Sequence, residues 1–155
     1  MTASAVHDTF AIERRFACTP RQVFSAFADP DLKRRWFANP GNWPNAVWEL
    51  DFRVGGGEVS SGGSPGCRHN EFRSRYHDIV PDERIVFAYD LLHDHRLISV
   101  SLTTIEIAPE GGGTRLVFTE QGVFFDGPEA AAARRNGTPS LLDRLGALLA
   151  QEEIR

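Results

Sequence analysis

The stretch TPSLLDRLGALLA, residues 138–150, decides the fold. Its leucines recur at the spacing that places them on one face of a helix: Leu141, Leu142, Leu145, Leu148 and Leu149. Thr138 is placed to cap the N-terminus of this helix. Pro139 then falls in the first turn, where its missing N–H costs no hydrogen bond. So wide a leucine stripe needs a large apolar partner, which strands expected earlier in the chain can supply.

Composition indicates one domain and excludes several classes of partner. The chain has 155 residues, and we assign residues 8–152 to one domain and residues 1–7 to a flexible N-terminus. A net charge of −4, from 17 basic and 21 acidic residues, gives no electrostatic basis for binding nucleic acid. No apolar run reaches the ~18 residues of a membrane span, and no signal-peptide pattern is present. Cys18 and Cys67 match no disulfide framework or metal spacing, which favours the cytoplasm.

Alternating apolar and polar residues predict a strand over residues 9–16 and about six more strands, joined by hairpins, up to residue 121. Two short helices follow the first strand, at Thr19-Pro20 and Asp29-Pro30, each a capping residue followed by proline. The alanine run 130–133 suggests a further short helix before the final one. Successive hairpins predict an antiparallel sheet and an α+β domain. A sheet of this length curls, and the final helix fills the curl.

This order of elements resembles the START-like (SRPBCC) superfamily and, more narrowly, the family of activator-of-heat-shock-protein-90-ATPase homologues. The stretches that carry the resemblance are IERRFACTPRQVFSAF (12–27), DPDLKRRWF (29–37), DFRVGG (51–56), VPDERIVF (80–87), GGTRL (112–116) and SLLDRL (140–145). The resemblance implies a helix-grip fold: a curved antiparallel sheet wrapped around a long C-terminal helix, with two short helices after the first strand. It also implies a cavity between the sheet and that helix.

The chain departs from the family pattern just before the last helix. Family members usually carry Gly-Trp there, whereas residues 135–139 read Arg-Asn-Gly-Thr-Pro. The aromatic side chain that would border the cavity is absent at this point. Phe124 or Phe125 could take its place.

Three patterns suggest chemistry but have simpler interpretations. Residues 55–57 are three glycines followed by no helix signal, so they indicate a strand break rather than a phosphate loop. His93-Asp94-His95 could contribute to a metal site with His77 or Asp90, but it falls at a polar hairpin tip where solvated histidines are ordinary. No nucleophile motif is present. We therefore assign no catalytic residue, no metal ligand and no cofactor.

Aromatic residues are the better candidates for a site, because small-molecule cavities are walled by large apolar side chains with a few polar groups. We expect the ligand to contact Trp36, Trp43, Trp48, Phe52, Phe72, Tyr76, Phe87, Tyr89, Phe118, Leu141 and Leu145, with Trp36 and Trp43 at the cavity mouth. The polar groups available to join them are Arg14, Tyr76, Tyr89, Arg96 and Ser101.

Three functions are compatible with this sequence. The first is a binding protein for a small, largely apolar or aromatic molecule, monomeric or homodimeric. The second is an enzyme of the cyclase or aromatase kind, with Tyr76, Asp90 or His77 moving a proton. The third, suggested by the family's name alone, is a co-chaperone-like interaction domain. We favour the first, because no catalytic constellation requires more.

Overall fold

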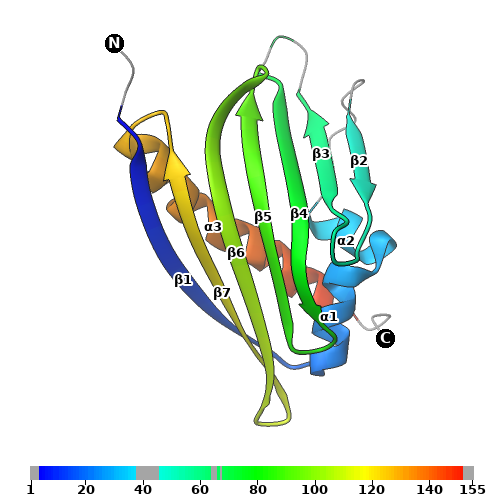
Figure 1. Ribbon diagram of the computed structural model, residues 1–155. Coiled ribbons are helices and arrows are strands. Elements are labelled where there is room, and N and C mark those ends of the chain that lie inside the picture. Colours follow the sequence, from blue (N-terminus) through cyan, green and yellow to red (C-terminus); the bar gives the residue numbers. More distant parts are fainter. Residues whose placement is uncertain (1–3, 38–45, 64–65, 67, 152–155) are drawn as a thin grey trace.

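The strands of the protein form one antiparallel sheet in the order β1-β7-β6-β5-β4-β3-β2. The computed structural model describes residues 4–37, 46–63, 66 and 68–151 (Figure 1). In chain order the elements are β1 (Val6–Phe16), α1 (Pro20–Ala28), α2 (Pro30–Trp36), β2 (Val47–Leu50), β3 (Glu58–Gly62), β4 (Asn70–Val80), β5 (Arg84–His93), β6 (Arg96–Glu110), β7 (Gly113–Phe124) and α3 (Pro128–Leu149). The α+β helix-grip architecture expected from the sequence is confirmed.

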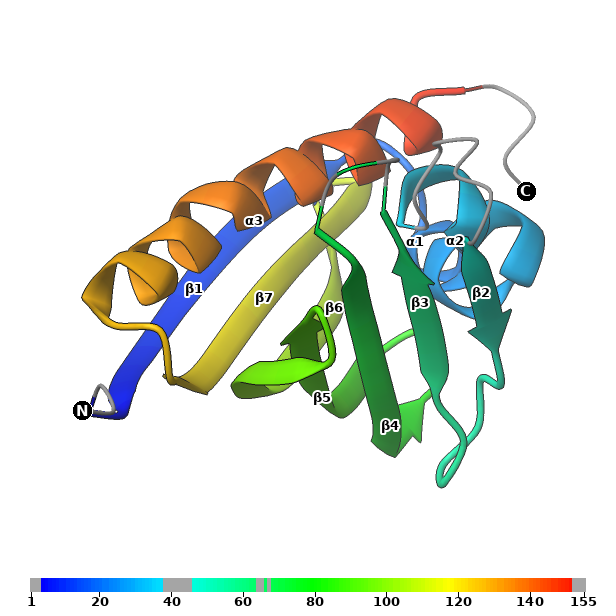
Figure 2. The same ribbon diagram turned by 90° about the horizontal axis from the view of Figure 1, so that it is seen from above.

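The sheet curves around α3, which crosses its concave face (Figure 2). The two short helices α1 and α2 connect β1, at one edge of the sheet, to β2 at the other. In Figure 2 they lie at the end of α3 that is farthest from its start, beside β2 and β3. The concave face is therefore covered by helices, whereas no described helix or strand covers the opposite, convex face.

The caps predicted for the two short helices are confirmed. Thr19 and Gln22 form a capping box: the Thr19 side chain accepts a hydrogen bond from the Gln22 backbone N–H, and the Gln22 side chain accepts one from the Thr19 backbone N–H. At α2, Asp29 accepts a hydrogen bond from the Asp31 backbone N–H, and Pro30 occupies the first turn. These caps satisfy backbone donors that have no partner within the helix, so both helices start where the sequence indicates.

The start predicted for the final helix is wrong. α3 begins at Pro128, runs without interruption through the alanine stretch and contains Pro139 in its interior. Thr138 is not a cap: its hydroxyl donates to the Arg134 carbonyl at 2.7 Å, one turn earlier. Pro128 and the alanines favour helix from this earlier point. The missing N–H of Pro139 removes one intrahelical bond, which is too little to end a helix anchored on the sheet.

The edge strand β1 and its neighbour β7 extend further than the alternation predicts. β1 begins at Val6 instead of Thr9, and β7 continues to Phe124 instead of Gln121. The two strands pair over their whole length, from Val6 opposite Phe124 to Phe16 opposite Thr114, so each supplies the hydrogen-bond partner that extends the other. The extension of β7 adds Gly122 and Phe124 to the face that already carries Glu120.

A buried ion pair joins α2 to the sheet. Lys33 Nζ lies 2.9 Å from Glu58 Oε1 on β3, and the Trp48 indole N–H donates to the other oxygen of Glu58 at 2.9 Å. The ammonium also lies 4.4 Å from the ring centre of Phe37. Because a buried charge is tolerated only when it is paired, these contacts fix the position of α2 against β3.

Candidate functional site

A cavity of about 700 Å³ lies between the concave face of the sheet and α3. Its apolar wall is formed by side chains from α1, α2, α3 and the central strands: Phe27, Trp36, Phe37, Phe72, Phe87, Leu91, Ile98, Ile105, Phe118 and Leu141. Exposed residues stand at its rim, among them Arg68, Gly137 and Arg144. This volume falls within the range of roughly 300–1,000 Å³ that is usual for small-molecule sites.

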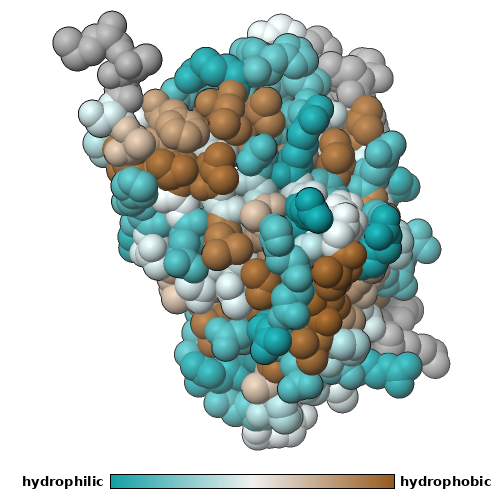
Figure 3. All heavy atoms as spheres, in the orientation of Figure 1, coloured by the Kyte–Doolittle hydropathy of each residue, from teal (hydrophilic) through white to brown (hydrophobic). Residues whose placement is uncertain are grey.

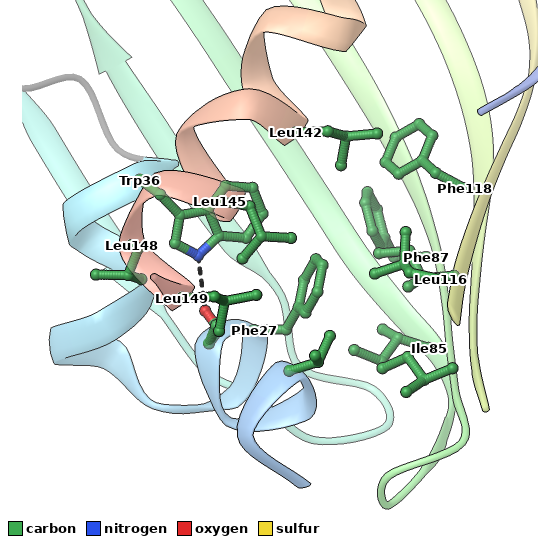
Figure 4. Packing of buried hydrophobic residues seen from close by; sticks show 14 of the residues in the cluster. Phe27, Trp36, Ile85, Phe87, Leu116, Phe118, Leu142, Leu145, Leu148 and Leu149 are labelled. Atoms are coloured by element: carbon green, nitrogen blue, oxygen red, sulfur yellow. Dashed lines mark hydrogen bonds between the residues drawn. The ribbon is translucent and has the colours of Figure 1, made fainter. Parts of the chain in front are cut away.

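The aromatic wall is held by ring contacts and one hydrogen bond. Phe27 and Trp36 meet edge to face with ring centres 5.0 Å apart, and Phe37 meets Phe72 in the same way at 5.0 Å. The Trp36 indole N–H donates to the Ala26 carbonyl at 2.8 Å, which ties the indole to α1 (Figure 4). Edge-to-face geometry is the favourable one for aromatic pairs, so these rings are fixed before any ligand arrives.

A polar cluster interrupts this apolar wall. Arg134 of α3 reaches the sheet, where its Nη1 donates to the Tyr89 hydroxyl at 2.6 Å, to Glu120 at 3.2 Å and to Ser101 at 3.3 Å. Its Nη2 donates to the Ser99 hydroxyl at 2.8 Å. The Tyr89 hydroxyl donates in turn to Glu120 Oε1 at 2.9 Å. Arg134, Glu120 and Tyr89 all line the cavity, so the cluster is part of its surface.

The cluster exists because β6 turns its polar side inward over its first half. Ser99, Ser101 and Thr103 are buried under α3, whereas Val100 and Leu102 on the opposite side are 36% and 39% exposed. Figure 3 shows the outer face to which Val100 and Leu102 belong, with apolar side chains among polar ones. Further along the strand, Ile105 and Ile107 face inward instead. The inner face of β6 thus changes from hydroxyl-bearing to aliphatic along its length.

Gly122 leaves room for the cluster on the neighbouring strand. A Cβ atom at this position would lie 2.8 Å from the Ser101 hydroxyl oxygen and 3.1 Å from the Phe124 ring. The Arg134 guanidinium lies 5.1 Å from the centre of that ring and 5.4 Å from the centre of the Tyr89 ring. Only glycine allows Ser101, Phe124 and Arg134 to approach one another this closely.

Burial sets the electrostatics of the site. Burial, and then the neighbouring Glu120 carboxylate, raise the pKa of Tyr89, so its hydroxyl stays protonated at neutral pH. Burial, followed by the charge of Arg68, lowers the pKa of His93 at the rim, which favours the neutral imidazole. Glu120 is 2% exposed and carries its charge beside Arg134. The polar cluster is therefore an internally paired arginine and glutamate with a neutral tyrosine between them.

The structure brings six of the expected contact residues together in the cavity wall. These are Trp36, Phe72, Phe87, Tyr89, Phe118 and Leu141. Trp43 lies outside the described residues. Among the leucines that opened the sequence argument, Leu141 alone lines the cavity, and the others of the stripe pack in the core.

Four other residues expected at the site do not line this cavity. Trp48 bonds to Glu58, Phe52 packs edge to face on Tyr76 with ring centres 4.9 Å apart, and Leu145 is fully buried in the core. Tyr76 is also buried, behind the cavity wall. Tyr76 and Leu145 belong to the same hydrophobic core as the wall residues, and Phe52 packs against that core. These side chains are therefore used in packing behind the wall.

Most of the expected polar groups do not line the cavity either. Arg14 pairs with Asp143 and Arg96 with Asp126, while His77 and Asp90 are exposed. Ser101 does belong to the polar cluster through Arg134. In the described residues no group of three or more His, Cys, Asp or Glu side chains converges as a metal site requires. Residues 55–57 lead into β3, so they form a turn and not a phosphate loop.

Sequence reasoning missed Glu120, Arg134, Ser99 and Thr103. A signal for Glu120 was present: on the predicted strand it shares a face with Leu116 and Phe118, where a carboxylate needs a buried partner. Arg134 had no comparable signal, because an arginine beside an alanine run is typical of a solvated helix face.

The sequence profile of one protein family, described as Activator of Hsp90 ATPase homolog 1-like protein, matches residues 17–150. The chain belongs to this family. Its helix-grip fold is of the ligand-binding kind, as in the START-like superfamily at large. Among the described helices, none has the length and apolar character needed to cross a membrane.

Solved structures of similar proteins share this fold over nearly the whole chain. The Mll3558 protein from Rhizobium loti is 46% identical, with a TM-score of 0.87 over 94% of this chain and 99% of that one. A putative uncharacterized protein from Rhizobium leguminosarum is 42% identical, with a TM-score of 0.89 over 96% and 98% of the two chains. Protein CV1439 from Chromobacterium violaceum is 28% identical, with a TM-score of 0.74 over 93% and 98%. The comparison with curated proteins gives no match.

Proposed function

We propose that this member of the Activator of Hsp90 ATPase homolog 1-like family binds a small, largely apolar molecule in the cavity between the sheet and α3. The main support for this proposal is the cavity itself, which has a volume of about 700 Å³ and a mainly aromatic and aliphatic wall. The rings of that wall are held by one another and by backbone contacts, so little ordering is needed when a ligand enters. We further propose that the protein acts as one domain in the cytoplasm, and that this domain includes Val6 and His7, because β1 begins at Val6.

Gly137 offers a direct test of this function. It lies at the rim of the cavity on α3, and a Cβ atom there would meet nothing within 4 Å, so a large side chain can grow from it without a backbone clash. Gly137→Trp should reduce saturable binding of N-phenyl-1-naphthylamine, followed by its fluorescence, by about tenfold. Ala132→Trp is the matched control, since Ala132 is exposed on the same helix and outside the wall.

Bound probe should also raise the melting temperature of the wild-type protein and of Ala132→Trp. If Gly137→Trp binds the probe as well as the control does, the site is not this cavity. If the wild-type protein shows no saturable binding, the proposed function fails.

A second candidate, a cyclase or aromatase, is favoured by one observation. Glu120 and Tyr89 are titratable groups in a mainly apolar wall, where one of them could move a proton to or from a folded substrate. The test is incubation with linear polyketones, with mass spectrometry to detect loss of water on ring closure. Activity that disappears in Glu120→Gln while probe binding persists would support the enzyme. A co-chaperone-like role has only the family's description behind it.

A further inference from the structure

The hydrogen bonds of Arg134 leave part of its guanidinium unused. Nη1 donates to Tyr89, Glu120 and Ser101, and Nη2 donates to Ser99. A guanidinium has five N–H groups, one on Nε and two on each Nη. In the described part of the chain, Nε and the second N–H of Nη2 therefore have no acceptor.

The unused Nε is accessible. No fully buried side-chain nitrogen or oxygen among the described residues lacks a hydrogen-bond partner, so an Nε without an acceptor cannot be fully buried. The Arg134 side chain is 14% exposed and lines the cavity. Its four protein acceptors hold the guanidinium in place, so the free donor has a fixed position. A ligand oxygen could accept from it without reorganising the wall.

The charge around this donor favours an uncharged acceptor. Glu120 lies 3.2 Å from Arg134 and already neutralises it. A carboxylate on the ligand would bring a second negative charge beside Glu120, in a place where water screens poorly. The other arginines of the wall, Arg68 and Arg144, are exposed at the rim, where water weakens their attraction for an anion.

We propose that the ligand carries one uncharged oxygen acceptor, a carbonyl or hydroxyl oxygen, which accepts a hydrogen bond from Arg134. The apolar body of the ligand then lies against Phe27, Phe87 and Phe118. This assignment rests on the proposed binding function and deepens it: the polar cluster selects oxygen-bearing aromatic or polycyclic molecules over pure hydrocarbons and over carboxylates of the same shape.

Three probes of nearly equal shape test the assignment on the wild-type protein by isothermal titration calorimetry. 2-Acetylnaphthalene carries a carbonyl group. 2-Isopropylnaphthalene has a methyl group in place of the carbonyl oxygen, and 2-naphthoate has a carboxylate in place of the acetyl group. A hydrogen bond to a charged donor predicts that the ketone binds about tenfold more tightly than the hydrocarbon. The ketone should also bind more tightly than the naphthoate.

A variant then assigns the preference to the cluster. Arg134→Met combined with Glu120→Gln removes the donor without leaving a buried charge unpaired. The ratio of the two Kd values, ketone against hydrocarbon, should fall to about one. Arg135→Met is the control, because Arg135 pairs with Asp8 outside the cavity and its loss should leave the ratio intact. If the double variant does not fold, Arg134→Gln combined with Glu120→Gln, which also removes the charged donor without leaving a buried charge unpaired, serves in its place.

The outcomes separate this assignment from the function on which it rests. Equal Kd values for ketone and hydrocarbon on the wild-type protein, or tightest binding by the naphthoate, would overturn the uncharged acceptor and leave the binding function standing. A ketone preference that survives in the double variant would also overturn it. If none of the three probes binds, the proposed function itself fails.

Discussion

Lys33 and Glu58 form an ion pair in which both side chains are almost wholly buried, 3% and 2% exposed, with 2.9 Å between Nζ and Oε1. The pair joins α2 to β3, and α2 carries the cavity residues Trp36 and Phe37. The geometry of the ligand wall on this side therefore depends on two charges that do not line the cavity.

Removing one partner of this pair should be costly. Lys33→Met leaves the Glu58 carboxylate buried, with the Trp48 indole as its one side-chain donor among the described residues. We expect a loss of about 3–5 kcal/mol in the free energy of unfolding. Urea denaturation measures it. Lys33→Met combined with Glu58→Gln should recover most of the loss, because no buried charge remains. A loss below about 1 kcal/mol for the single variant would mean that water reaches the pair.

The two tyrosines of the chain should titrate abnormally. Burial, and then Glu58, raise the pKa of Tyr76, as burial and Glu120 do for Tyr89. In the unfolded chain both ionise near pH 10. The unfolded state therefore releases protons before the folded state does, so this contribution to stability is present below about pH 10 and is lost as the pH rises above it.

Ultraviolet absorbance of tyrosinate, followed together with circular dichroism, checks this. Both tyrosines should ionise only as the protein unfolds in alkali. Because the chain contains no third tyrosine, the whole absorbance change comes from these two residues. Tyr89→Phe and Tyr76→Phe assign the two signals. Ionisation near pH 10 with native circular dichroism would show that at least one hydroxyl reaches solvent.

Much of this architecture could be predicted from local patterns. Alternation located the strands, and Thr19-Pro20 and Asp29-Pro30 located both short helices, because strand faces and helix caps are recorded in neighbouring residues. The helix start at Pro128 could not be found in this way. Pro139 looks like a first-turn proline, and only packing of α3 on the sheet explains why the helix continues through it.

The polar cluster could not be predicted because it depends on which sides of β5, β6 and β7 face α3. Ser99, Ser101 and Thr103 form one side of β6 in any register, and alternation alone does not say which side is buried. The inward side is chosen by Arg134 and Glu120, which lie 14 residues apart in sequence and meet across the cavity wall. Aromatic residues were assigned to the site by type alone, which is why the prediction included Trp48 and Phe52, which do not line the cavity.

Because the polar side of β6 faces inward, substitutions on its two faces should change the stability by different amounts. Val100→Thr on the outer face should change the free energy of unfolding by no more than about 0.5 kcal/mol, because the side chain is partly exposed already. Ser101→Val on the inner face should cost about 1–3 kcal/mol, since it crowds Gly122 and removes an acceptor of Arg134. Thermal unfolding of both variants makes the comparison. A larger loss for Val100→Thr would mean that the outer face is covered in solution.

The glycines that flank the cavity should also respond in opposite directions to the same substitution. Gly137→Ala adds a methyl group where nothing lies within 4 Å and replaces a poor helix former inside α3, so we expect a gain of about 1 kcal/mol in the free energy of unfolding. Gly122→Ala places its Cβ against Ser101 and Phe124 and should lose about 1–3 kcal/mol. Because the chemical change is identical, the difference isolates the space around each position. Chemical denaturation of the two variants side by side measures both changes. A loss of stability in Gly137→Ala would mean that the space beside Gly137 is not open in solution.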